Sequence, residues 1–179
     1  MHALLTLFFL NDIQNRRYSE RKIMKKITPC LWFNFNAEEA VNFYLSIFES
    51  GKILDESRYG DAVPELNGKI LTMRFEIEGQ EFIALNGGPQ YPFSEAISLF
   101  VDCETQEEVD HYWDKLCEGG SPGRCAWLKD KFGLSWQIVP RSLVTMLQDD
   151  DAVRSARVMK AMMEMSKIDV ALLEQAYRE

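Results

Sequence analysis

The chain has 179 residues, 46% of them hydrophobic, which is enough for one domain with its own core. Charged residues make up 27% and are spread along the chain, which argues against a disordered tail. The formal net charge is −8 and no cluster of Lys and Arg occurs, so we expect no binding of nucleic acid.

Residues 1–23 differ in character from the rest of the chain. The apolar run 3–10 is too short to span a bilayer, and no basic segment precedes it as in a signal peptide. Met24, followed by two lysines, resembles a translation start. We expect residues 1–23 to be an upstream extension or a dispensable arm, the alternative being a native helix packed on the domain. Residues 24–179 are expected to form a single domain.

The cysteine pattern is typical of a reducing compartment. The cysteines fit no C-x-x-C metal or redox spacing and no secreted disulfide framework. We therefore expect a cytoplasmic protein, without membrane association, whose thiols stay reduced: Cys30, Cys103, Cys117 and Cys125.

Two stretches of the chain repeat when the sequence is shifted by 68 residues. Both copies combine an apolar strand, a helix with an apolar stripe at helical spacing, and a glycine at the helix end. The repeat therefore predicts a duplicated module. Residues 29–51 align without gaps with residues 97–119, and these pairs are identical: Leu31 with Leu99, Glu39 with Glu107, Val41 with Val109, Tyr44 with Tyr112, and Gly51 with Gly119.

The first module is expected over residues 27–88. A strand at 27–35 leads to a helix that starts at Asn36, and Glu39 three residues later has the spacing of a capping box. Residues 89–95 form a linker, because their two prolines disfavour a helix or a central strand. Three apolar or alternating strands complete the module: 52–59, 69–77 and 81–86.

The second module is expected over residues 96–140, with helices over 141–179. A strand at 96–103 precedes a helix that starts at Thr105, with Glu108 in the capping-box position. Only two further strands are visible, 124–129 and 134–139. In the C-terminal part, aspartates suit the positive end of a helix dipole, and methionines are expected to pack rather than bind a metal: Asp149, Asp150, Asp151, Met159, Met162, Met163 and Met165.

These elements predict an α+β fold of paired βαβββ modules that form a cup-shaped, half-open sheet, followed by C-terminal helices. With these residues, the modules resemble the PhnB-like branch of the vicinal oxygen chelate superfamily, the glyoxalase and bleomycin resistance fold. That branch also carries the name 3-demethylubiquinone-9 3-methyltransferase. The resemblance extends from about residue 25 to the C-terminus and rests on these stretches: ITPCLWF at 27–33, AEEAVNFY at 37–44, GLSW at 133–136, ARVMKAMM at 156–163 and KID at 167–169.

The resemblance implies a cup in which His or Glu side chains of the first and last strands hold a divalent metal. The first-strand positions here are Thr28 and Ala96, and the last-strand positions align with Ala84 or Asn86 and with Gln137. None is an imidazole, a thiolate or a carboxylate, the ligands that first-row divalent metals favour. We therefore expect no metal site and no cofactor.

Alternation along the strands selects the side chains that face the cup. For Trp32 the alternative role is ordinary core packing, and for Asn86 and Gln137 it is cross-linking of strands. Arg74 either faces the cup, where it can bind a carboxylate or phosphate in a bidentate manner, or faces solvent at the sheet edge. The candidates for ligand binding are Trp32, Asn34, Arg74, Asn86, Phe100 and Gln137.

No catalytic motif stands out. Cys30 has cup-facing parity, but apolar surroundings raise the pKa of a thiol, so we expect an inert, buried cysteine. His111 is expected to be a surface or packing residue, and neither a Ser-His-acid set nor a P-loop occurs. The methyltransferase name finds no support, because the first strand–helix junction at 34–36 lacks a glycine-rich turn and the glycines at 87–88 precede the linker.

We therefore expect a protein of unassigned activity that binds a small organic ligand in the cup. A homodimer is expected, because half-cups of this superfamily often complete each other across subunits. The alternative is a metal-dependent lyase, isomerase or dioxygenase of the same superfamily with displaced ligands. The carboxylates available for that alternative are Asp102, Glu76 and Glu81.

Overall fold

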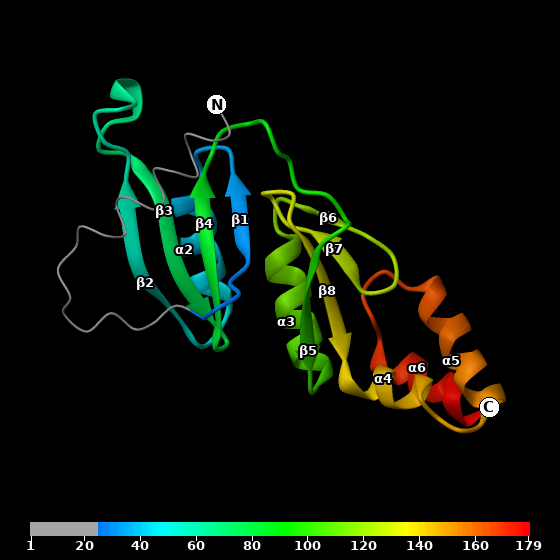
Figure 1. Cartoon of the computed structure of the whole chain (residues 1–179). Coiled ribbons are helices and arrows are strands. Elements are labelled where there is room, and N and C mark those ends of the chain that lie inside the picture. Colours follow the sequence, from blue (N-terminus) through cyan, green and yellow to red (C-terminus); the bar gives the residue numbers. More distant parts are fainter. Residues whose placement is uncertain (1–24) are drawn as a thin grey trace.

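The computed structural model describes residues 25–179, so the prediction for residues 1–23 lies outside the described part. Figure 1 shows two sheets side by side, with helices of the C-terminal part beyond the second sheet. None of the helices in residues 25–179 has the length and apolarity that crossing a membrane requires.

The first sheet has the strand order β1-β4-β3-β2 and carries one helix. β1 runs parallel to β4, whereas β4 with β3 and β3 with β2 are antiparallel. β1 ends earlier than predicted because the chain bends at Asn34 and Phe35. The elements are β1 (Cys30–Phe33), α2 (Ala37–Ile47), β2 (Gly51–Arg58), the 3-10 turn η1 (Pro64–Leu66), β3 (Ile70–Ile77) and β4 (Gln80–Asn86).

The second sheet repeats this arrangement with the order β5-β8-β7-β6. β5 runs parallel to β8, and β7 is antiparallel to both of its neighbours. The predicted α+β fold of paired βαβββ modules is thereby confirmed. β6 was not predicted, because it has two residues, one of them a proline, and shows no alternation. The elements are β5 (Ser98–Cys103), α3 (Gln106–Cys117), β6 (Ser121–Pro122), β7 (Trp127–Lys129) and β8 (Ser135–Pro140).

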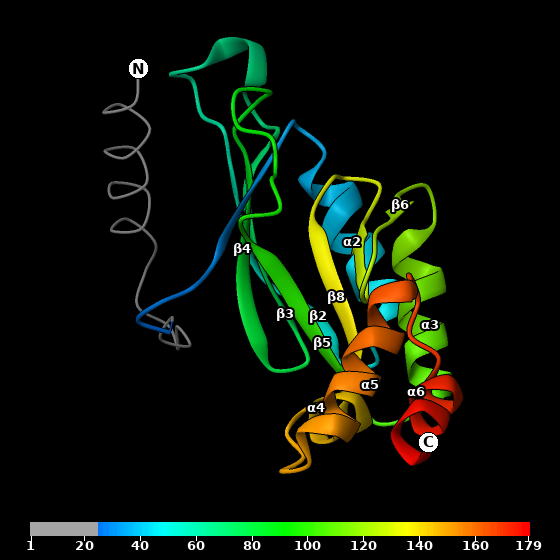
Figure 2. The ribbon, with the colours of Figure 1, turned by 90° about the vertical axis from the view of Figure 1, so that its right-hand side faces the viewer.

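One core unites the two modules. α2 packs on β3 and β4, and α3 packs on β5, β7 and β8. In Figure 2, α2 lies on the side of the first sheet that faces the second module. Buried side chains of both modules therefore belong to one cluster, which includes Val41, Tyr44, Phe75, Leu116 and Trp136.

The buried carboxylate of Asp130 joins the modules through four hydrogen bonds. Oδ1 accepts from the backbone N–H groups of Phe132 at 2.9 Å and Leu134 at 3.0 Å. Oδ2 accepts from the Tyr44 hydroxyl of α2 at 2.8 Å and from the Trp136 indole of β8 at 2.9 Å. Burial raises the pKa of Asp130, and the four donors oppose this shift without cancelling it.

The two long modular helices begin differently. At α3, the predicted capping box is confirmed on the Thr105 side, whose hydroxyl accepts from the N–H of Glu108 at 3.2 Å. At α2, the predicted cap by Asn36 is wrong, because its side chain makes no cap hydrogen bond. The Asn86 side chain replaces it, since its Oδ1 accepts from the N–H of Ala37 at 2.9 Å.

Three helices follow the second sheet: α4 (Arg141–Leu147), α5 (Ala152–Glu164) and α6 (Val170–Arg178). They enclose a second, smaller cluster around buried Val158 and Leu173. The packing role predicted for the methionines is confirmed for Met162 and Met165, which lie against this cluster, whereas Met159 and Met163 are exposed.

Candidate functional site

Each sheet has one face packed on its helix and one face turned away from it. Period-two alternation assigns side chains to these faces, since neighbouring residues of a strand point to opposite sides. We call the side of the first sheet opposite α2 the first face: Cys30, Trp32, Arg74, Glu81, Ile83 and Leu85. The side of the second sheet opposite α3 is the second face: Ser98, Phe100, Asp102, Trp127 and Gln137.

The strand register of the first face brings two predicted ligand contacts into adjacent rows. Trp32 on β1 pairs with Leu85 on β4. In the neighbouring row, Ile83 on β4 lies opposite Arg74 on β3. The first face therefore places an aromatic and aliphatic wall beside a guanidinium group.

The indole of Trp32 is held in place by the linker. Its Nε1 donates a hydrogen bond to the carbonyl of Gly88 at 2.8 Å, and its ring meets the Tyr91 ring edge-on, with centroids 4.9 Å apart. Gly87 permits this approach, because a Cβ at that position would lie 2.2 Å from the indole. Trp32 is half-buried, so part of its ring surface remains available.

Arg74 does not lie at the sheet edge, because β3 is an inner strand between β4 and β2. Its guanidinium is 3.3 Å from the Glu81 carboxylate, longer than the roughly 2.8 Å typical of a strong charge-assisted hydrogen bond. The Nε atom of Arg74 is buried and has no hydrogen-bond partner among residues 25–179. The side chains of Arg74 and Glu81 are 18% and 2% exposed. Arg74 therefore keeps an unused donor inside the first face.

The second face presents an exposed aromatic ring. Phe100 on β5 is 55% exposed, and Ile97, which lies just before β5, is 70% exposed. Gln137 pairs with Phe100 across β8 and donates from Nε2 to the Ser98 hydroxyl at 2.8 Å. Gln137 therefore cross-links β5 and β8, and contact of Gln137 or Phe100 with a ligand stays a prediction.

The alignment of Ala84 and Asn86 with the cup is wrong by one residue. Ala84 is fully buried on the α2 side of β4, and Asn86 points the same way. The Asn86 amide is occupied in the fold, since it also donates from Nδ2 to the carbonyl of Ile70 at 3.1 Å. Asn34 is exposed in the bend after β1, and its side chain makes no hydrogen bond with another described residue.

The residues at the four aligned metal positions do not fit a divalent ion. The Thr28 hydroxyl donates to the carbonyl of Lys25 at 3.2 Å, Ala84 and Ala96 offer no ligand atom, and the Gln137 amide is a weak ligand that is already hydrogen-bonded. Within residues 25–179 no three side chains of His, Cys, Asp or Glu are grouped to hold a metal.

The three carboxylates considered for displaced metal binding each face a cation. Glu81 lies beside Arg74, and Glu76 lies 3.3 Å from Lys52. Asp102 accepts from Arg141 at 2.6 Å at the far end of the second face. Only Glu76 and Glu81 lie opposite each other, across β3 and β4.

Cys30 and His111 have the surroundings of structural rather than catalytic residues. Desolvation by neighbouring side chains raises the pKa of the Cys30 thiol, which disfavours the nucleophilic thiolate. His111 on α3 is hydrogen-bonded through Nε2 to the carbonyl of Ile47 on α2 at 2.9 Å, and its ring meets the edge of the Tyr112 ring. The raised pKa of Cys30 agrees with the inert role expected of it, but the expected burial is wrong, because Cys30 is exposed at the start of β1. The contacts of His111 agree with the packing role expected from the sequence.

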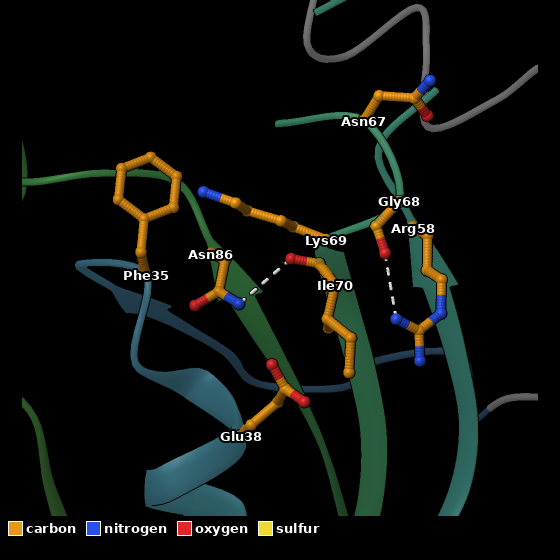
Figure 3. A pocket seen from close by; sticks show the side chains of 8 residues that line it. All are labelled: Phe35, Glu38, Arg58, Asn67, Gly68, Lys69, Ile70 and Asn86. Atoms are coloured by element: carbon orange, nitrogen blue, oxygen red, sulfur yellow. Dashed lines mark hydrogen bonds between the residues drawn. The ribbon is translucent and has the colours of Figure 1, made fainter. Parts of the chain in front are cut away.

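A pocket of about 480 Å³ opens on the other side of the first sheet, where β3 begins and β4 ends (Figure 3). Asn86, which lines this pocket, is a ligand contact predicted from the sequence for the cup, but the pocket itself was not predicted. The sequence does not indicate the pocket because it depends on the backbone conformation of Phe35. This residue occupies the left-handed region with φ of 58°, which no sequence pattern indicates. The pocket is lined by Phe35, Glu38, Arg58, Asn67, Gly68, Lys69, Ile70 and Asn86.

The paired modules define a protein with the glyoxalase/bleomycin resistance-like fold. Residues 25–139 match the family model described as 3-demethylubiquinone-9 3-methyltransferase, and the chain belongs to this family, which confirms the PhnB-like resemblance. No curated protein matches the chain.

The chain is also similar to solved structures. The PhnB protein from Bacillus cereus, which bears that methyltransferase name provisionally, is 37% identical, with a TM-score of 0.59 over 65% of this chain and 99% of its own. PA1353 from Pseudomonas aeruginosa is 24% identical, with a TM-score of 0.54 over 65% and 98% of the two chains. The fosfomycin resistance protein FosX from Listeria monocytogenes is 19% identical, with a TM-score of 0.49 over 71% and 99%.

Proposed function

We propose that this PhnB-like protein binds a small organic anion at the first face, without a metal. The observation that carries the proposal is the Arg74 guanidinium, which has a buried Nε without a partner in the described part of the chain and a long contact to Glu81. A buried polar group that lacks a hydrogen bond is costly, and an oxyanion satisfies a guanidinium in bidentate geometry.

The neighbouring side chains favour an anion with an apolar body. Trp32, Ile83 and Leu85 line the same face as Arg74. Small-molecule sites commonly combine such apolar walls with a few polar groups that set orientation. The ligand class is therefore a small organic molecule with a carboxylate or a related oxyanion at one end.

The proposal includes a homodimer in which the second face of one copy closes the first face of the other. Phe100 exposes its ring on the second face, and aromatic side chains are enriched in the contact regions of protein interfaces. A second copy with the same first face supplies the complementary apolar wall around Trp32. The bound anion would then be shielded from water.

Two alternatives are less well supported. A displaced metal site would require Glu76, Glu81 or Asp102 to give up a neighbouring cation. Methyl transfer, which the family description names, would call for a cofactor-binding turn, but Gly87 serves the approach of Trp32 instead.

The proposed site predicts a selective effect of Arg74→Met. Ligand-observed NMR with acetate, benzoate and phenylphosphonate should detect binding of the two aromatic anions to the wild-type protein. Loss of the guanidinium should weaken that binding at least about tenfold, because a bidentate charge-assisted contact disappears. Arg178→Met, an exposed residue of α6 paired with Glu174, is the matched control and should bind as the wild type does. Equal binding by Arg74→Met, or no binding of any probe to the wild type, would contradict the proposal.

A further inference from the structure

The pocket in Figure 3 lies on the α2 side of the first sheet, so it is separate from the first face. Its volume of about 480 Å³ falls within the roughly 300–1,000 Å³ range of small-molecule sites. Its walls come from the bend after β1, the first turn of α2, the loop before β3 and the end of β4.

Phe35 stands in this pocket at a cost that its packing does not explain. Its φ of 58° is unusual for a bulky side chain, since Cβ then crowds the backbone. The ring is 50% exposed and does not belong to the core cluster. A strained residue that the core does not use is typical of functional sites.

Some charged side chains of the pocket are bonded to other groups of the protein, and others are not. Arg58 is occupied, because it donates to the carbonyl of Gly68 at 3.0 Å and to Glu56 at 2.7 Å. Lys69 and Glu38, by contrast, form no ion pair with any other residue of the described range 25–179. Figure 3 shows Lys69 reaching toward Phe35, with Glu38 on the helical wall. One cation and one carboxylate are thus available on different walls.

The floor of the pocket is polar and fixed. Asn86 is 4% exposed, and its bonds to Ala37 and Ile70 use one of its two N–H groups and one lone pair of its side-chain oxygen. The Tyr59 hydroxyl also donates to the backbone carbonyl of Asn86, which holds the end of β4 in place. A rigid polar floor of this kind can orient a ligand without rearranging.

We propose that this pocket is a second binding site, which takes a small aromatic zwitterion of the aromatic amino acid class. The carboxylate of the ligand pairs with Lys69, its ammonium pairs with Glu38, and its ring packs on Phe35. A simple anion would leave Glu38 repelling it, and a simple cation would meet Lys69 in the same way. The site is independent of the anion site at the first face.

Titration calorimetry of four probes on the Arg74→Met protein, in which the anion site at the first face is disabled, tests the charge pattern. L-Phenylalanine is expected to bind, whereas 3-phenylpropionate and phenethylamine, which each lack one charge, should bind several-fold more weakly. L-Alanine, which lacks the ring, should also bind more weakly. Equal binding of the three aromatic probes, or no binding of L-phenylalanine, would overturn the proposal.

Three variants assign the contacts. Lys69→Met and Glu38→Gln should each weaken L-phenylalanine binding roughly two- to tenfold, and Glu38→Gln should improve the relative binding of 3-phenylpropionate. Lys160→Met on α5 is the control and should leave binding unchanged. Arg74→Met should also leave it unchanged, which separates failure of this site from failure of the anion site. Wild-type affinity in both Lys69→Met and Glu38→Gln would overturn the assignment.

Phe35→Gly separates function from structure most clearly. Glycine accepts the left-handed conformation without strain, so the melting temperature should stay the same or rise by roughly 2–4 °C, while L-phenylalanine binding is lost. A fall in melting temperature by a similar amount would show that the ring supports the fold, and the proposed role of Phe35 would be wrong. Phe35→Leu, which keeps an apolar side chain, should retain the fold and lose the stacking contact.

Discussion

Replacing Asp130 with alanine is expected to lower the free energy of unfolding by about 3–5 kcal/mol, because several buried donors lose their acceptor together. The donors are the Tyr44 hydroxyl, the Trp136 indole and two backbone N–H groups. Tyr44 belongs to the first module and Trp136 to the second, so the substitution weakens the contact that joins the two modules. Both side chains are almost fully buried, and water cannot easily replace the carboxylate.

Urea unfolding followed by tryptophan fluorescence measures this effect. Tyr44→Phe removes one of the four donors and should cost about 1–3 kcal/mol, less than the loss of the carboxylate. Asp150→Ala, at an exposed aspartate ahead of α5, should change stability by less than about 0.5 kcal/mol. An Asp130→Ala protein within about 1 kcal/mol of the wild type would show that Asp130 does not join the modules.

The effect of Asp130 should also depend on pH. Burial raises its pKa in the folded protein above the value in the unfolded chain, so the folded state binds this proton more tightly. The stabilising contribution is then complete below the unfolded pKa and is lost as pH rises through the folded pKa. The stability gap between wild type and Asp130→Ala is therefore expected to be wider near pH 4 than near pH 7.

The second large effect concerns assembly. Phe100→Arg is expected to weaken the proposed homodimer at least about 30-fold, since it puts a charge where an exposed aromatic ring would be buried. Sedimentation velocity over a range of protein concentrations measures the change. The wild type should sediment as a dimer at micromolar concentration, and the variant should sediment as a monomer with an unchanged melting curve.

Val153→Arg provides the matched control for this experiment. Val153 is 65% exposed on α5, outside the second face, so a new arginine there should leave the dimer intact. A monomeric wild-type protein, or a Phe100→Arg dimer as tight as the wild type, would contradict assembly through the second face.

Local patterns predicted most of the fold because the elements follow simple periodicity. The repeat, the apolar stripes of α2 and α3, and the cup-facing parity of Trp32 follow from spacing alone, whereas the choice between the cup and the sheet edge for Arg74 needed the strand order. The strand β6 could not be found in this way, because its two residues are too few to show alternation.

The details that failed depend on contacts distant in the sequence. Whether Asn86 faces the cup or α2 depends on the exact register of β4 against β1, and a shift of one residue reverses the side. The same residue replaces the cap expected from Asn36, 50 positions earlier. Asp130 lies between β7 and β8, and its partner Tyr44 is brought to it only by the packing of the two modules.

The left-handed conformation of Phe35 has a similar origin. Phenylalanine does not favour a positive φ, so the chain gives no local sign of it. The pocket therefore appears only when the bend after β1, the loop before β3 and the end of β4 are assembled. The periodicity of the sequence therefore predicts the faces of the sheets but not the pocket at the end of the first sheet.

Equilibrium dialysis against Zn²⁺, Ni²⁺, Mn²⁺ and Fe²⁺ tests most directly whether this member of the family uses Arg74 in place of a metal. Since Thr28, Ala96 and Gln137 occupy the aligned ligand positions, we expect no tight stoichiometric binding of any of the four ions. One tightly bound ion per chain, lost on Glu76→Ala, Glu81→Ala or Asp102→Ala, would contradict this and favour a metal-dependent enzyme with displaced ligands.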